Sequence, residues 1–428
     1  MKIHSLPQPV QLPKSAFIVW KKLKDHGYDC FCAGGFVRDL LLNQKSDDVD
    51  LATNASPDQV SLLFPKTLPL GKRFGSVVVL IKEQDMTHGI EVTTFRSDGL
   101  YLDGRRPESV TPSNPEEDAS RRDFSINGLF YDPETSVIID FVGGLEDLEK
   151  GCLRAIGDPW KRFEEDRLRI LRGVRFAARL NYEIEPVTFE AMKALSYSVS
   201  HCVSAERIWQ ELTKTDQDFK FKEAMLLFYR LGLLEYLFGL DIDPLFLQKR
   251  LSEIPVFLPL VLKLTLLWSH ETLFSKDCLL KLSELKISRK DLFLLEQVEK
   301  GLMWLDTKAD PLISLEMIQW AQKSGDDLDS LSLVLSILRG EKASKIFWKL
   351  LLEHPLTSYL RERGPLFKAG DLIPYQIPPG KKMGALLHWL HEQAAKHQSI
   401  DKAYLLSLLE KEQEGQFLLM EAQKGTPS

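Results

Sequence analysis

Residues 32–53 read CAGGFVRDLLLNQKSDDVDLAT, and the first part of the chain is organised around this stretch. The residue types predict a strand, a tight turn, a short helix and a second strand. Gly34 and Gly35 let the backbone turn sharply, because glycine has no Cβ to clash. The apolar residues 37–42 predict a short helix whose first amides face the turn, a position that suits a phosphate group. Arg38 adds a positive charge beside these amides.

The second strand carries two carboxylates. Asp48 and Asp50 flank Val49, and alternation along a strand places both carboxylates on one face. Mg²⁺ prefers oxygen ligands and is usually held by one or two carboxylates together with substrate phosphates. A pair of such ions can activate a hydroxyl and stabilise a leaving pyrophosphate. The alternative is a polar loop with surface acids, but the neighbouring glycine turn and arginine favour a nucleotidyl-transfer site.

A second motif, RRDFSIN, occupies residues 121–127, and a strand-like segment, IEVTTF, occupies residues 90–95. With the opening stretch, they resemble the class II branch of the tRNA nucleotidyltransferase and bacterial poly(A) polymerase family. The resemblance covers about residues 25–215. It implies an α+β fold, with a nucleotidyltransferase-type mixed-sheet head domain followed by an all-helical neck, body and tail.

The resemblance also implies roles for individual residues. Asp48 and Asp50 would hold the metal, and Glu91 would supply a third acid to the site, unless it simply faces solvent. Arg122 would contact the incoming triphosphate and Asp123 the ribose. The alternative for Asp123 is an ion pair that holds the head domain together.

Residues 157–180, GDPWKRFEEDRLRILRGVRFAARL, match the EDxLRxLRxxRFAA motif of the same family. Asp158 before a proline predicts a helix start, and apolar residues recur at helical spacing after it. Asp166, Arg169 and Arg172 are three residues apart and would form a stripe on one helix face. A solvated charge stripe is the alternative. The arginine density and the lack of paired acids further along the segment argue against it.

The chemistry of this stripe suits recognition of a base. Cytosine and adenine each present an amino donor beside an unprotonated ring nitrogen. The carboxylate of Asp166 only accepts hydrogen bonds and the guanidinium of Arg169 only donates them, so the pair complements both bases. Guanine and uracil would leave buried groups unpaired. Arg172 would face the phosphates, and Arg175 is carried over from the motif although an ideal helix turns it away from Asp166.

Composition limits the alternatives. The 428 residues predict two to four domains, and 44% hydrophobic residues support packed cores. The most apolar run, residues 254–268, is interrupted by two prolines and a lysine, so no membrane span is expected. The N-terminus lacks the apolar core of a signal peptide, and five scattered cysteines predict no disulfide framework, which favours the cytoplasm. The net charge of −6 conceals a basic segment, because residues 150–180 hold nine Lys or Arg against four acids.

The remaining sequence reads as loop and helices. Residues 96–117 are rich in Gly, Pro and charge and predict a flexible loop, which in the family helps to change nucleotide specificity. Ser204–Leu212 resembles the family's SxERIxxEL helix. No metal or nucleophile motif follows residue 219, residues 370–384 resemble a tRNA-holding tail, and residues past Glu412 are expected to fray. We predict domains at 1–145 (head), 146–215 (neck), 216–330 (body) and 331–428 (tail).

The predicted activity is attack of an RNA 3′-hydroxyl on the α-phosphate of CTP or ATP with Mg²⁺ as cofactor. The predicted partners are tRNA lacking its CCA end, ATP and CTP, with no membrane. The nucleotide-binding residues are predicted to be Gly34, Gly35, Arg38, Arg122, Asp123, Asp166, Arg169, Arg172 and Arg175. A poly(A) polymerase and an enzyme that adds only the terminal A are the alternatives. The acidic C-terminus favours tRNA, whereas RRDFSINGLFYD is closer to polymerases. An inactive RNA-binding module is disfavoured because Asp48 and Asp50 are both present, and a small-molecule adenylyltransferase would have no use for the helical body.

Overall fold

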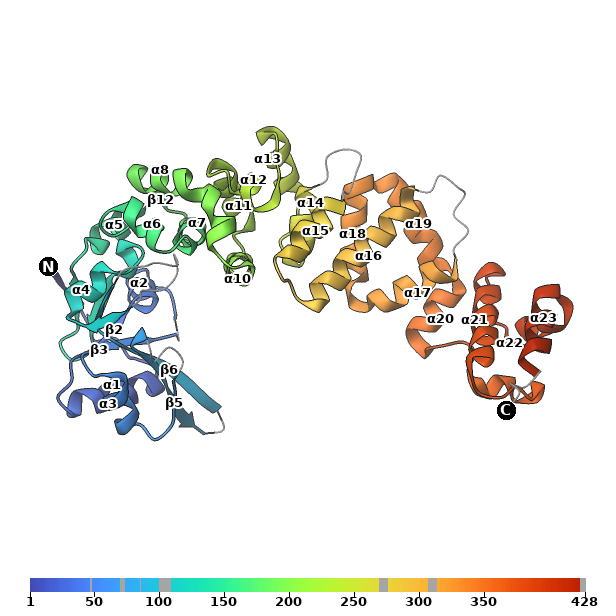
Figure 1. Ribbon diagram of the computed structural model, residues 1–428, viewed down its shortest axis with the longest axis horizontal. Coiled ribbons are helices and arrows are strands. Elements are labelled where there is room, and N and C mark those ends of the chain that lie inside the picture. The colour runs from blue at the N-terminus through green and yellow to red at the C-terminus, as the bar shows by residue number, and fades with distance from the viewer. Residues whose placement is uncertain are drawn as a thin grey trace. The chain divides into compact units, whose positions relative to one another are not determined.

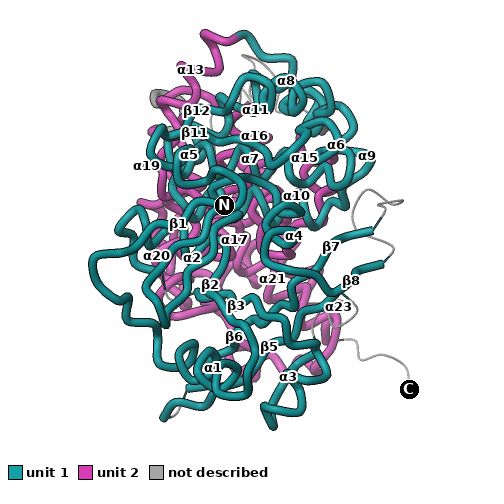
Figure 2. The backbone as a smooth tube through the Cα atoms, turned by 90° about the vertical axis from the view of Figure 1, so that its left-hand side faces the viewer, with its two compact units in different colours: residues 1–243 teal, residues 244–428 magenta. Residues whose placement is uncertain are grey.

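The computed structural model describes residues 1–46, 48–69, 74–84, 86–99, 109–268, 276–306 and 314–423. The chain divides into two compact units, residues 1–243 and residues 244–428, which Figure 2 shows in different colours. The first unit combines a mixed sheet with helices and the second consists of helices, so the predicted α+β class is confirmed. The four predicted domains remain a proposal.

The first unit contains an eight-stranded sheet, of which some strands are labelled in Figure 1. Its spatial order is β1-β10-β9-β2-β3-β6-β5-β4, and within it only β3 and β6 pair in parallel among the described residues. The strands are β1 (Lys2–Ser5), β2 (Cys30–Ala33), β3 (Asp50–Thr53), β4 (Thr67–Leu68), β5 (Ser76–Glu83), β6 (Met86–Thr94), β9 (Leu129–Asp132) and β10 (Val137–Asp140).

The two faces of this sheet differ in character. One face carries the main apolar core, where Cys30, Cys32 and Leu51 pack with α1 (Lys14–Asp25) and α3 (Pro57–Leu63). Burying each large apolar side chain contributes about 1.5–3 kcal/mol, so this face supplies much of the driving force for folding. The other face carries small residues and rings, among them Ala33 and Ala52. The cysteines are therefore core residues, as their position in the sequence predicted.

The predicted strands at β2, β3, β5, β6 and β10 are confirmed with small differences at their ends. Strands β1 and β9 were not predicted; they complete the sheet on the side of β2 and β10. The expectation of a flexible loop over residues 96–117 is wrong for its described parts. They form the paired strands β7 (Arg96–Asp98) and β8 (Val110–Pro112) and the start of α4 (Pro115–Ser120), while residues 100–108 lie outside the described residues.

Helices follow the sheet in the first unit: α2 (Gly35–Leu41, between β2 and β3), α5 (Gly144–Lys150), α6 (Pro159–Glu165), α7 (Leu168–Leu180), α8 (Pro186–Leu195), α9 (Val199–Cys202), α10 (Ala205–Gln217), α11 (Phe221–Arg230) and α12 (Leu233–Phe238), with a short ladder of β11 (Cys152–Leu153) and β12 (Glu183–Ile184). The predicted N-cap is confirmed, since the Asp158 side chain accepts from the Trp160 amide at 3.0 Å. Helix α7 packs against α10 and α11. A Cβ at Gly173 on α7 would come within 2.9 Å of Met192 and Phe124, so the helix approaches its neighbours closely there.

The second unit contains the helices α13 (Pro244–Glu253), α14 (Leu260–Leu267), α15 (Lys276–Glu284), α16 (Arg289–Asp306), α17 (Leu315–Ser324), α18 (Leu328–Arg339), α19 (Glu341–Glu353), α20 (Pro355–Arg363), α21 (Lys381–Lys396), α22 (Lys402–Lys411) and α23 (Gln413–Gln423). Every residue of α14 is buried, so the most apolar run of the sequence is a core helix. The expected fraying past Glu412 is wrong up to residue 423, because α23 packs against α21 and α22. No helix within the described residues has the length and apolar character needed to cross a membrane.

Candidate active site

The glycine turn lies where β2 meets α2. Gly34 has a φ of +68°, in the left-handed region that glycine tolerates best. A Cβ on Gly34 would lie 3.1 Å from Nη1 of Arg122 and 4.0 Å from Oδ2 of Asp50. The glycine is therefore needed both for its backbone angle and for the close approach of an arginine and a carboxylate.

Asp48 and Asp50 lie beside this turn, and Glu91 lies on a neighbouring strand. Asp48 and Asp50 are exposed while Val49 and Leu51 are buried, which is the predicted alternation. Strands β3 and β6 pair in parallel, with Leu51 opposite Val92, so Glu91 lies next to Asp50 on the neighbouring strand. In the described part of the chain no three His, Cys, Asp or Glu side chains lie close enough together to hold a metal ion. Asp48 and Asp50 alone remain the predicted metal carboxylates, and Glu91 stands beside them.

The electrostatics of Asp50 fit a cation. Asp50 is exposed as a residue and lines the pocket, but the surrounding protein partly desolvates its carboxyl. This partial burial, and after it the negative charges of Glu91 and Asp48, raise its pKa to about 7. Arg122 offsets only part of this effect. A divalent cation would neutralise the repulsion between the carboxylates, so the donor set suits such an ion.

A pocket of about 700 Å³ is lined by Asp48, Asp50, the start of α2 and residues along α7 from Leu168 to Arg179. Eleven of the twelve predicted site residues line it and Glu91 does not. They are Gly34, Gly35, Arg38, Asp48, Asp50, Arg122, Asp123, Asp166, Arg169, Arg172 and Arg175. The whole lining holds ten Lys or Arg against five Asp, so the pocket is basic although the chain is acidic. This charge suits a triphosphate and an RNA backbone.

Arg38 is buried in the wall of the pocket. Its Nε and Nη2 donate to Asp39 Oδ1 at 2.8 and 2.7 Å, and its Nη1 donates to Asn127 Oδ1 at 2.7 Å. The guanidinium carbon lies 5.1 Å from the centre of the Phe176 ring. Arg38 therefore fixes α2 against the RRDFSIN segment in this structure, and its predicted contact with phosphate remains a proposal.

The spacing predicted that Asp166 and Arg169 lie on one continuous helix. This prediction is wrong, because the helix is interrupted between them. Asp166 ends α6 in an extended conformation, with φ −150° and ψ 107°, and α7 begins at Leu168. Its Oδ1 accepts from the Leu168 amide at 3.0 Å, and both of its oxygens accept from Arg207 at 3.3 and 2.8 Å. The break turns the carboxylate into the pocket, and a carboxylate has about four acceptor positions. One acceptor position therefore remains for a ligand beyond the contacts described.

The arginines of α7 each have an acidic partner, so the expectation that paired acids are lacking is wrong. Arg169 pairs with Glu165 at 2.6 Å, Arg172 with Asp123 at 2.7 Å and Arg175 with Glu211 at 2.8 Å. All three acids lie outside α7, and Asp123 and Glu211 are far from it in the sequence, so the sequence of α7 alone does not reveal these pairs. Both Arg172 and Arg175 also lie over the Phe176 ring, at 5.2 and 4.3 Å from its centre.

Asp123 is buried between the sheet and α7. It accepts from the Phe124 amide at 2.8 Å, from Asn127 at 3.1 Å and from Arg172. Burial alone would raise the pKa of Asp123, but the charge of Arg172 and these hydrogen bonds hold it well below its usual range. The ion-pair alternative for Asp123 thus has a partner in the structure. A contact with ribose remains a proposal, since Asp123 also lines the pocket.

The pocket includes residues that were not predicted: Lys45, Arg121, Asn127, Arg179, Arg207 and Lys214. Arg207 belongs to the SxERIxxEL segment, so the resemblance had located it without giving it a role. Arg121 and Asn127 begin and end RRDFSIN, and Arg179 belongs to the basic surplus of residues 150–180. The sequence signals were therefore present, but no local pattern tied them to one cavity.

Comparison with known proteins finds two family models that match separate segments of this chain. A family model described as the poly A polymerase head domain matches residues 30–154. A second, described as a probable RNA- and SrmB-binding site of polymerase A, matches residues 181–244. A CCA-adding enzyme of Streptococcus uberis is 41% identical over 242 residues, which cover 56% of this chain and 58% of the relative. That of Geobacillus stearothermophilus is 42% identical over 228 residues, covering 53% of this chain and 55% of the relative. The chain thus spans little more than half the length of these curated relatives.

Solved structures align over more of the chain. The Bacillus stearothermophilus CCA-adding enzyme in complex with CTP has a TM-score of 0.70 and 27% identity, covering 93% of this chain and 98% of that one. The Thermotoga maritima CCA-adding enzyme complexed with tRNA has a TM-score of 0.59 at 20% identity, over 95% and 98% of the two chains. The second likeness supports the fold alone.

Proposed function

We propose that the chain is a member of the family of tRNA nucleotidyltransferases and bacterial poly(A) polymerases, and that it adds C and A to the 3′ end of tRNA. The observation that carries the proposal is that one basic pocket is lined both by Asp48 and Asp50 and by the Asp166–Arg169 pair. One site could therefore select the base and transfer the nucleotide. Such a role would place the protein in the cytoplasm, where tRNA is processed.

The catalytic half of the pocket is formed by Asp48, Asp50 and the glycine turn. We propose that Asp48 and Asp50 hold Mg²⁺, with Glu91 supporting their charge from β6. A bound pair of ions would activate the RNA 3′-hydroxyl and stabilise the departing pyrophosphate. Arg122 carries a fixed positive charge beside Gly34, where it would bind and orient the triphosphate.

The selective half is formed by Asp166 and Arg169. The open acceptor position of Asp166 suits the amino group of cytosine or adenine, and Arg169 would donate to the neighbouring ring nitrogen. Uracil and guanine would place an oxygen against the carboxylate and leave it without a donor. No nucleic-acid template is required for this choice, because the protein side chains read the edge of the base.

The relatives named above are CCA-adding enzymes, which favours a counted CCA product. The head-domain model carries the name of poly A polymerase, so a polymerase that adds only A is the second candidate. Both candidates would use the same carboxylates. They differ in the primer that they accept and in where addition stops.

The test is a time course with purified protein, Mg²⁺ and each labelled nucleoside triphosphate separately and together. The primers are tRNA ending at positions 73, 74 and 75, with oligo(A) as an unstructured control, and the Asp48→Ala variant is the inactive control. We expect tRNA ending at position 73 to gain CCA and then stall, while oligo(A) is extended poorly. Long A ladders on oligo(A) without C on tRNA would identify a poly(A) polymerase. Addition of A only to tRNA ending in CC would identify an A-adding enzyme.

A further inference from the structure

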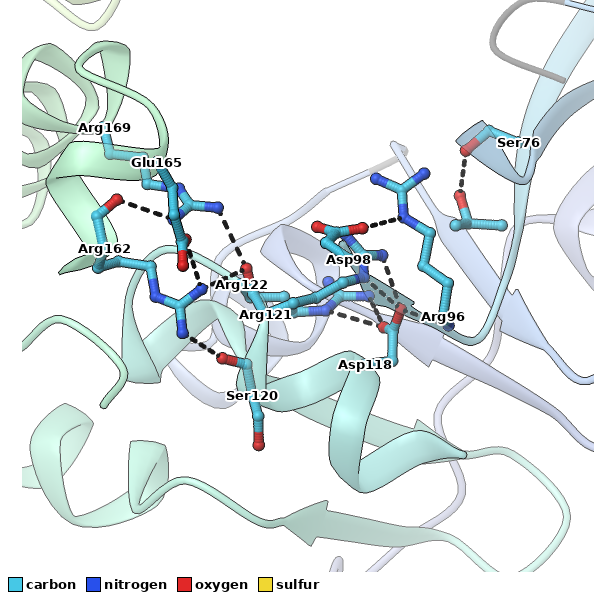
Figure 3. A network of polar contacts seen from close by, with 11 residues as sticks. Ser76, Arg96, Asp98, Asp118, Ser120, Arg121, Arg122, Arg162, Glu165 and Arg169 are labelled. Atoms are coloured by element: carbon cyan, nitrogen blue, oxygen red, sulfur yellow. Dashed lines mark hydrogen bonds and ion pairs between the residues drawn. The ribbon is translucent and has the colours of Figure 1, made fainter. Parts of the chain in front are cut away.

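Asp118 is a buried carboxylate on α4 that does not line the pocket. Its Oδ1 accepts from Nε and Nη2 of Arg121 at 2.9 and 2.6 Å. Its Oδ2 accepts from Nε and Nη2 of Arg122 at 3.3 and 3.0 Å (Figure 3). Burial alone would raise the pKa of Asp118, but the charges of Arg122 and Arg121 outweigh it and hold the pKa below its ordinary value. One ionised side chain thus holds two consecutive arginines, one on each oxygen.

Arg122, the second arginine that Asp118 binds, lies beside the glycine turn and Asp50. With its Nε and one Nη held by Asp118, the guanidinium directs Nη1 toward the glycine turn, where a Cβ on Gly34 would be 3.1 Å away. Nη1 also donates to the Asn127 carbonyl at 3.4 Å, and the guanidinium lies 5.2 Å from the centre of the Phe130 ring. The same Cβ position would be 4.0 Å from Oδ2 of Asp50, so Arg122 and Asp50 approach the same turn. Asp118 therefore helps to set the position of a guanidinium beside the glycine turn and Asp50.

Arg121, the first arginine that Asp118 binds, contacts Arg169, the arginine proposed to read the base. The carbonyl of Arg121 accepts from Nη2 of Arg169 at 3.2 Å and from Nη1 of Arg162 at 3.3 Å (Figure 3). This carbonyl belongs to the peptide unit that joins Arg121 to Arg122. Since both flanking side chains bind Asp118, the plane of that peptide is fixed from both ends. Its oxygen in turn helps to fix the guanidinium of Arg169.

We propose that Asp118 is a positioning residue. It fixes the guanidinium of Arg122, which would bind the triphosphate, and through the Arg121 carbonyl that of Arg169, which would read the base. Asp118 itself lies outside the pocket. The inference rests on the proposed function. It means that one carboxylate determines how the catalytic half and the selective half of the pocket are placed relative to each other. Loss of Asp118 disturbs nucleotide binding and base selection at once. A residue that served only the packing of α4 would change stability and neither of these properties.

The first test uses the Asp118→Asn variant of the full chain, which keeps the size of the side chain and removes its charge. The matched control is Glu116→Gln, an exposed acid of the same helix. Steady-state kinetics on tRNA ending at position 73 give KM and kcat for CTP and ATP, and incorporation of UTP measures base selection. We expect KM for both nucleotides to rise about tenfold and the preference for CTP over UTP to fall about tenfold, the effect of one misplaced charged hydrogen bond. The control keeps wild-type values.

The Asp118→Glu variant keeps the buried negative charge, so it remains informative if Asp118→Asn fails to fold. The extra methylene displaces both oxygens, and we expect smaller shifts of KM and of base preference in the same directions. Thermal unfolding is measured beside the kinetics for each variant. A lower Tm with unchanged KM and selectivity overturns the proposal, and so does a shift in only one of the two properties. Failure of the wild-type protein to add C or A would instead overturn the proposed function.

Discussion

Replacing Asp166 by alanine tests the selective half of the pocket most directly. Asp166 reaches the pocket because the chain breaks between α6 and α7, and both of its oxygens also hold Arg207. The Asp166→Ala variant removes the acceptor for the amino group of cytosine or adenine. It also removes the negative charge that excludes the carbonyl oxygen of uracil or guanine. We therefore expect relaxed selection among nucleotides, with Asp48 and Asp50 untouched.

The size of the effect follows from the bond that is lost. A hydrogen bond to a charged group contributes about 1.5–3 kcal/mol. Since about 1.4 kcal/mol corresponds to a factor of ten, the preference for CTP over UTP should fall by about 10- to 150-fold. Arg207 loses its partner in the same variant, but its side chain is 18% exposed and can be hydrated in part. The loss of stability should therefore be smaller than for a fully buried pair.

The assay compares kcat/KM for all four nucleotides on tRNA ending at position 73, with Tm measured in parallel. Glu164→Ala is the matched control, because Glu164 is an exposed acid of α6 that does not line the pocket. We expect the control to keep wild-type selectivity. If Asp166→Ala also kept its preference for CTP and ATP, Asp166 would serve only to hold Arg207, and the argument for base reading would fail.

Three further outcomes are expected. Asp48→Ala and Asp50→Ala should each lower kcat by at least about 1000-fold, because several kcal/mol of metal assistance are lost. CTP binding, measured by equilibrium dialysis, should be retained. A rate of a tenth of the wild-type value in either variant would contradict the metal assignment. Glu211→Gln should destabilise the fold by about 3–5 kcal/mol in urea, because it leaves the buried Arg175 without its partner, and an unchanged midpoint would show that Arg175 is satisfied elsewhere. The pKa of Asp50 is 3.8 ordinarily and about 7 in the folded protein, so the folded state binds more protons between these values, and Tm in EDTA should fall as the pH rises from about 4 to 7. Asp50→Asn should flatten that dependence, and an equal slope in both proteins would assign it to another group.

Short-range features of this protein follow from the sequence alone. Only glycine adopts the φ of Gly34 without strain, so the turn and the strand before it were predictable. The alternation expected of a strand correctly predicted that Asp48 and Asp50 are exposed and Val49 is buried, although β3 begins only at Asp50. The N-cap at Asp158 followed from the preference of a carboxylate for free helix amides. Each of these rules acts within a few residues, and the sequence therefore contains all that it needs.

Only the tertiary structure decided which charges are paired and where Asp166 points. Arg172 meets Asp123 across 49 residues, and Arg207 meets Asp166 across 41. Neither separation leaves a local signal, so the stripe of α7 looked unpaired in the sequence. The break between α6 and α7 was hidden for the same reason, because the apolar spacing is helical throughout and the contact with Arg207 that holds Asp166 comes from α10. Long-range burial and ion pairing, which local propensity does not encode, determined how one pocket brings Asp48 and Asp50 together with Asp166 and Arg169.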